Sequence, residues 1–88
     1  MPKYIVFRTV GEISEEEIEA ASLRSMEALE RMPQVRWIRS YYSAEEGKIY
    51  CEYHAPSAEA VLEHARRAGM PVDRISEVSL EISPEMFV

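Results

Sequence analysis

Residues 35–55 read VRWIRSYYSAEEGKIYCEYHA, and this central stretch decides the fold that we expect. It contains two runs rich in aromatic and β-branched residues, 35–43 and 48–55, and such runs are typical of β-strands. The four residues between them, 44–47, end in Gly47, which can adopt the positive φ that a tight turn requires. The stretch therefore predicts an antiparallel hairpin in the middle of the chain.

A helix is predicted on each side of this hairpin. The first spans about residues 15–31, and Ser14 with Glu17 three residues later forms the pattern of a capping box. The second follows Ser57, a good N-cap residue, and ends at Gly69, which suits the left-handed end of a helix. Both helices carry apolar residues at helical spacing, although the stripe on the first is narrow.

Two further strand patterns, at residues 3–9 and 74–82, complete the order βαββαβ within one domain, residues 1–88. This order is the ferredoxin-like split βαβ arrangement, an α+β fold with an antiparallel sheet in the order 4-1-3-2. Because each crossover is right-handed, both helices are expected on one face of the sheet. The other face is left bare.

The hairpin loop sets which side chains share the bare face. A four-residue loop pairs Tyr41 with Tyr50, Arg39 with Glu52 and Trp37 with His54, whereas a three-residue loop with a bulge would shift this pairing by one. Alternation then predicts the set on the bare face: Tyr4, Val6, Arg8, Trp37, Arg39, Tyr41, Tyr50, Glu52, His54, Ser79 and Glu81. The set expected under the helices is Ile5, Phe7, Ile38, Ile49, Cys51, Tyr53, Val78, Leu80 and Ile82.

Such an aromatic and charged surface is rarely left exposed on a monomer. We therefore expect a homodimer, in which two sheets pack face to face as a dimeric α+β barrel with room for a pocket between them. The residues expected at this dimer face or pocket are Tyr4, Arg8, Trp37, Arg39, Tyr41, Tyr50 and Glu81.

Composition excludes several classes of function. The 88 residues carry a net charge of -6 and only two lysines, which argues against binding to nucleic acids or to anionic membranes. No apolar run is long enough to span a bilayer, and the run at residues 4–8 is too short for a signal peptide. Cys51 is the single cysteine, so it cannot form an intrachain disulfide or a cysteine zinc cage. These observations predict a cytoplasmic protein.

The sequence also resembles a small bacterial family of nickel-binding domains of unknown function. The resemblance rests on Trp37–Tyr41, Lys48–Tyr53, Ala55–Pro56, Glu63–Pro71 and Ile75–Val78, with further similarity in Pro2–Arg8 and Ile13–Ile18. It implies a ferredoxin-like homodimer that, in some members, binds nickel at its surface, and it implies no established reaction. Two features depart from the family pattern: the loop 44–47 looks longer, and His54 stands where an acidic residue is expected.

The candidate metal ligands are His64, His54 and Glu52. Glu52 and His54 are two residues apart on one strand, so their side chains point to the same face about 7 Å apart, and imidazole with carboxylate suits a divalent ion such as nickel. The alternative is a charge network at the dimer interface, because Arg39 competes for Glu52. His64, on the second helix, is the first choice of ligand; the alternative is a half-buried histidine hydrogen-bonded to another element.

No motif for nucleophilic catalysis or for phosphate binding is present, and no organic cofactor is expected. We therefore expect a nickel-binding homodimer without catalysis. The alternative is a monooxygenase-like or isomerase-like enzyme, or a small-molecule binder, that uses the pocket between the two sheets. That pocket would offer Arg8, Tyr41, Tyr50, Glu52 and His54.

Overall fold

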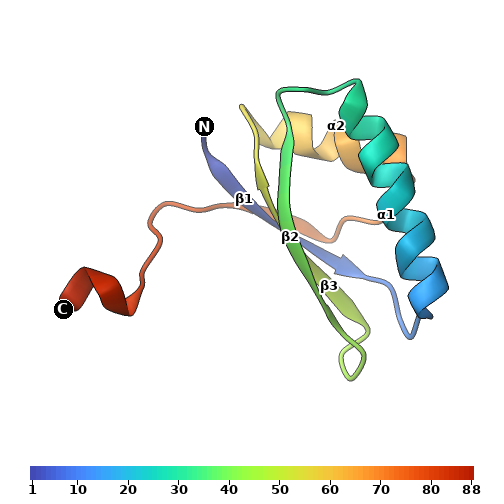
Figure 1. The fold of residues 1–88 in the computed structure, drawn as a ribbon, viewed down its shortest axis with the longest axis horizontal. Coiled ribbons are helices and arrows are strands. Elements are labelled where there is room, and N and C mark those ends of the chain that lie inside the picture. Colours follow the sequence, from blue (N-terminus) through green and yellow to red (C-terminus); the bar gives the residue numbers. More distant parts are fainter.

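The computed structural model describes all residues from 1 to 88. The element order is β1 (Lys3–Thr9), α1 (Glu15–Glu30), β2 (Arg36–Ser43), β3 (Lys48–His54), α2 (Ala58–Ala68), β4 (Arg74–Glu77) and a short 3-10 helix, η1 (Pro84–Phe87). The strands form one antiparallel sheet in the order β2-β3-β1-β4, and α1 and α2 cover one face of it (Figure 1). This confirms the predicted ferredoxin-like α+β fold and its strand order.

The two long helices begin and end where their caps predict. At the start of α1, the backbone N–H of Glu17 donates to Ser14 Oγ and that of Ser14 donates to Glu17 Oε1, both at 3.1 Å. At the start of α2, the N–H of Ala60 donates to Ser57 Oγ at 3.2 Å. Gly69 ends α2 in the left-handed conformation, with φ 68°. No helix is long and apolar enough to cross a membrane.

The two faces of β1 are the reverse of the prediction. Tyr4, Val6 and Arg8 are buried on the helix side, while Ile5 and Phe7 lie half-buried on the open face. The pairing shows why, because Val6 lies opposite the buried Cys51 and directly paired residues share a face. Both alternating sets of β1 contain apolar residues, so the charge of Arg8 was a misleading guide to the surface.

The hairpin register is confirmed for residues 39–43 and wrong for Trp37. A β-bulge between Trp37 and Arg39 makes Ile38 an extra residue, so Trp37 lies opposite Tyr53 instead of His54. The bulge turns Trp37 to the helix side, where it packs against the core, and leaves Arg39 on the open face.

The last strand is shorter than predicted and ends at Glu77. Its partner β1 begins at Lys3, whose carbonyl accepts the final hydrogen bond from Val78 N–H at 2.8 Å, so the chain beyond it has no strand to pair with. Leu80 and Ile82, which were expected under the helices, are therefore exposed, with 66% and 71% of their surface accessible. Residues 79–88 extend away from the body and end in η1 (Figure 1).

The core lies on the helix side of the sheet, at the end that α2 covers. Eight residues form it, namely Tyr4, Val6, Met32, Val35, Cys51, Tyr53, Ala55 and Val61. Only Ser25 of α1 is buried, whereas four residues of α2 are. The helix α1 therefore stands over the sheet without filling the space beneath it.

Candidate functional site

The open face of the sheet carries a cluster of charged and polar side chains around Glu52. Its Oε1 accepts a hydrogen bond from Tyr41 OH at 3.0 Å and lies 4.0 Å from Arg39 Nε. Its Oε2 lies 3.7 Å from Lys3 Nζ, and that ammonium also donates to Glu81 Oε1 at 2.6 Å. The two carboxylates therefore share one ammonium group.

His54 lies beside this cluster, because it is paired with Lys3 across β1 and β3. Its Nδ1 is buried and has no hydrogen-bond partner. The hydrogen bond from Lys3 lowers the pKa of Glu81, and the same contact raises the pKa of Lys3. Imidazole and carboxylate are suitable nickel donors, but no three such groups within the chain are placed to hold a metal ion.

His64 occupies a different part of the molecule. It is fully buried, with 0% of its surface accessible, and its Nε2 is hydrogen-bonded to Ser25 Oγ at 3.0 Å, which ties α2 to α1. The ring packs edge-on to Tyr53 with centroids 5.3 Å apart. Burial lowers the pKa of His64, and the nearby Arg8 lowers it further.

The structure does not bring together the three residues predicted as metal ligands. Glu52 and His54 lie on the open face, and His64 lies beneath the sheet on the helix side. One ion therefore cannot contact all three. The strand spacing correctly placed Glu52 and His54 on one face. The hydrogen-bond partner of His64 is Ser25, on α1, which no local sequence pattern identifies.

The predicted dimer face divides in the same way. Arg39, Tyr41, Tyr50 and Glu81 lie on or beside the open face, where Tyr50 OH donates to Glu46 Oε1 at 2.6 Å. Tyr4, Arg8 and Trp37 lie on the helix side, so this part of the prediction is wrong. The reversal of β1 and the bulge in β2 account for the three errors.

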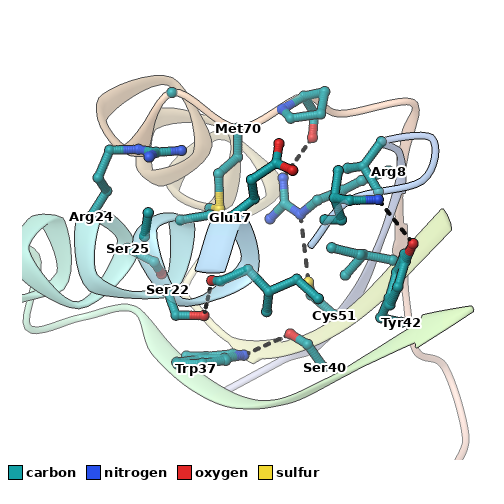
Figure 2. A pocket seen from close by; sticks show the side chains of 18 of the residues that line it. Arg8, Glu17, Ser22, Arg24, Ser25, Trp37, Ser40, Tyr42, Cys51 and Met70 are labelled. Atoms are coloured by element: carbon teal, nitrogen blue, oxygen red, sulfur yellow. Dashed lines mark hydrogen bonds between the residues drawn. The ribbon is translucent and has the colours of Figure 1, made fainter. Parts of the chain in front are cut away.

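A cavity of about 550 Å³ lies between α1 and the sheet, on the side opposite the open face. Its walls come from β1, β2, β3, α1 and the segment 69–71, and Figure 2 shows the side chains that converge on it. The prediction placed a pocket between two sheets and did not anticipate this one. The signal was present in the narrow apolar stripe of α1, because Ala20, Ala21 and Ser22 are too short to fill the space.

Arg8 extends from β1 into the wall of this cavity and is 2% exposed. Its Nη1 donates to the carbonyl of Pro71 at 2.7 Å, its Nη2 to Tyr53 OH at 3.1 Å and its Nε to Cys51 Sγ at 3.5 Å. All three acceptors are uncharged groups, and no carboxylate lies within salt-bridge distance of the guanidinium.

The hairpin tip is hydrogen-bonded to the chain that leads into α1, and this chain contributes Val10 and Ile13 to the cavity wall. The carbonyl of Gly47 accepts hydrogen bonds from Val10 N–H and Gly11 N–H, both at 2.9 Å. Tyr42 OH accepts from Ile13 N–H at 3.1 Å. A Cβ on Gly47 would stand 3.0 Å from the Cα of Gly11, and its φ is +66°, so this position requires glycine.

Comparisons with known proteins agree with this fold. The sequence model of a family described as nickel responsive protein SCO4226-like matches residues 4–78. The crystal structure of SCO4226 from Streptomyces coelicolor A3(2) is similar, with a TM-score of 0.81 and 28% sequence identity over 91% of this chain and 99% of that one. No curated protein matches the chain significantly.

Proposed function

Because the chain belongs to the SCO4226-like family of nickel responsive proteins, we propose that it binds nickel as a homodimer. The match over residues 4–78 is the observation that carries the proposal, and we assign the protein no reaction. The lone cysteine, Cys51, is buried and free, in keeping with the cytoplasmic location that the sequence predicts.

We place the nickel on the open face, at His54 and Glu52. The Nδ1 atoms of His54 and His64 are both buried and unpartnered, but only His54 lies beside a carboxylate on the open face, two residues from Glu52. Lys3 Nζ lies 3.7 Å from Glu52 Oε2, so a cation already sits beside this carboxylate. One chain does not assemble three donors, so we assign the remaining ligands to the second copy of the homodimer.

His64 does not take part in this proposal. It could reach an ion only if α1 and α2 separated, because it is fully buried and hydrogen-bonded to Ser25. Burial also stabilises its neutral ring and makes it a packing residue between two helices and Tyr53.

The homodimer is supported by apolar surface that a single chain leaves uncovered. Ile5 and Phe7 lie on the open face of a sheet that has helices on its other face only. The tail adds Leu80, Ile82 and Phe87, all well exposed, on a segment that extends away from the body (Figure 1). A second copy that packs on the sheet and receives this tail would bury both surfaces.

Calorimetric titration of the metal-free protein with Ni(II) tests the metal site. The two histidines form a matched pair, because the chain has no others. We expect His54→Ala to weaken nickel binding at least tenfold and His64→Ala, where it folds, to leave it within twofold. Nickel binding that survives His54→Ala unchanged contradicts the site, and the absence of any binding by the wild type contradicts the proposed function.

Sedimentation of the metal-free chain tests the dimer. We expect the wild type to sediment as a dimer at micromolar concentration and Ile82→Asp to shift it towards the monomer, since a charge would then enter the interface. Leu62→Asp, at an equally apolar exposed position on α2, is the control and should sediment as the wild type does. A wild type that sediments as a monomer overturns the account of the open face.

A further inference from the structure

We propose that the cavity between α1 and the sheet binds a small organic carboxylate, with its charged end on Arg8 and its apolar body against α1 and β2. This inference concerns the helix side of the sheet. It goes beyond the proposed nickel function and does not depend on it.

Arg8 is the contact for the charged end of the ligand. A guanidinium is positively charged at any physiological pH, and burying a charge is costly unless an opposite charge accompanies it. Arg8 is 2% exposed and has only the neutral partners Pro71, Tyr53 and Cys51. Three of its five N–H groups are used in these bonds, which leaves two to donate to an incoming anion.

The other charged side chains around the cavity do not neutralise Arg8. Glu17 is exposed, and its Oε1 accepts from both the N–H and the Oγ of Ser14 in the capping box. Arg24 is exposed as well, and its Nε donates to the carbonyl of Ala68 at 3.0 Å. Nearby, burial holds the pKa of His64 below its usual range, so the histidine adds no charge at neutral pH. The cavity therefore contains one buried positive charge.

The remaining walls of the cavity suit an apolar ligand body. Eleven of the 19 residues around the cavity are hydrophobic, among them Ile18 on α1, Ile49 on β3 and Trp37 on β2. The volume of about 550 Å³ lies within the range of small-molecule sites, which are mostly apolar with a few convergent polar groups. In Figure 2, Arg8 lies at one side of the cavity and Trp37 at the other, so the two ends differ in chemistry.

A carboxylate fits better than a phosphate. The planar fork of a guanidinium matches the two oxygens of a carboxylate, and a single buried cation balances a single negative charge. A doubly charged phosphate would need a second buried cation, and Arg24 is exposed at the rim. Walls of isoleucine, alanine and tryptophan further favour an aryl or medium-chain alkyl acid.

Titration of the metal-free full-length chain with phenylacetate and octanoate, with their neutral amides as matched probes, tests the proposal. Trp37 is the only tryptophan, so its fluorescence and its indole N–H resonance report on this cavity alone. We expect saturable binding of a carboxylate, one per chain, with a shift of the Trp37 signals and at least tenfold weaker binding of the amide. Equal binding of acid and amide, or no response to either acid at millimolar concentration, overturns the proposal.

Three variants locate the ligand. Arg8→Gln should reduce carboxylate affinity at least tenfold. Ala21→Phe, which fills the cavity and leaves Arg8 in place, should abolish binding, and it keeps the test decisive if Arg8→Gln does not fold. Arg74→Gln is the matched control, because this arginine lies on the open face over the ring of Phe7. Loss of binding in Arg74→Gln, or its survival in Ala21→Phe, would overturn the assignment.

Discussion

The two helices cover the same face of the sheet but pack against it in different ways. Helix α2 has 11 residues, four of them buried, and Val61 belongs to the core. Helix α1 has 16 residues and only Ser25 is buried, in its contact with α2. The longer helix therefore contributes less to the core than the shorter one.

The side of the sheet under α2 therefore provides stability, and the side under α1 provides space for a ligand. Since the cavity lies under α1, larger side chains on that side of the sheet would fill it. Burial under α2 supplies the hydrophobic stabilisation that a chain of 88 residues needs. Four changes test how far the two helices differ in this way.

Truncating the buried face of α2 should cost far more than truncating α1. Val61 is 0% exposed, so Val61→Ala removes two packed methyl groups and should lower the free energy of unfolding by about 2–3 kcal/mol. Leu23→Ala, at an exposed position of α1, should change it by less than about 0.5 kcal/mol. Urea unfolding measures both, and equal losses would show that the two helices contribute alike.

The stability of the contact between α1 and α2 should depend on pH through His64. Burial lowers the pKa of this histidine below 6.5, so the unfolded chain takes up a proton that the folded chain refuses. Stability is therefore full above pH 6.5 and decreases as the pH falls towards the folded-state pKa, by at most about 1.4 kcal/mol per pH unit for one proton. We expect His64→Gln to remove this slope between pH 7 and 5, and His54→Gln to retain it.

Loss of an N-cap should loosen α1 more than α2, because α1 has fewer buried contacts to hold it. Ser14→Ala removes the capping box and should cost about 1 kcal/mol. Amide hydrogen exchange should become faster in the first turn of α1, whereas Ser57→Ala should leave exchange at Val61 almost unchanged. Similar fraying of both helices would contradict the comparison.

The smallest effect is expected at the surface of α2, where Glu63 accepts hydrogen bonds from Arg66 and Arg67. These bonds lower the pKa of Glu63 to about 2, and carbon NMR of its carboxyl group should show that titration. The contribution to stability is present above pH 4.5 and is lost as the pH falls towards 2. Since the ion pairs are exposed, Glu63→Gln should shift the melting temperature only slightly at pH 7.

Features that depend on neighbouring residues could be predicted from the sequence. The caps at Ser14, Ser57 and Gly69 and the pairing of residues 39–43 with β3 follow from local hydrogen bonds and loop length. The strand order followed from the βαββαβ order of elements, and the placement of both helices on one face followed from the right-handed crossovers. These parts of the fold require no knowledge of which distant side chains meet.

Features that depend on partners distant in the sequence could not be predicted. The two faces of β1 were predicted the wrong way round because the burial of Arg8 depends on the carbonyl of Pro71, which is 63 residues away in the sequence. The short residues of α1 indicated space beneath that helix, but the charged wall of the cavity could not be predicted for the same reason, since it is Arg8. On the candidate metal face, the strand period identified Glu52 and His54, and alternation placed Glu81 on the same face. Lys3, which contacts both carboxylates, comes from the strand whose faces were predicted the wrong way round.

The bulge at Ile38 has a consequence for how the length of this chain can vary. Trp37 and Arg39 lie opposite the consecutive residues Tyr53 and Glu52, so Ile38 has no paired residue on β3. Deleting it would leave every other residue of β2 facing its present side. Deleting Ser40 instead would turn the guanidinium of Arg39 towards the helices. Related chains that are one residue shorter in this strand are therefore best aligned with their gap at position 38.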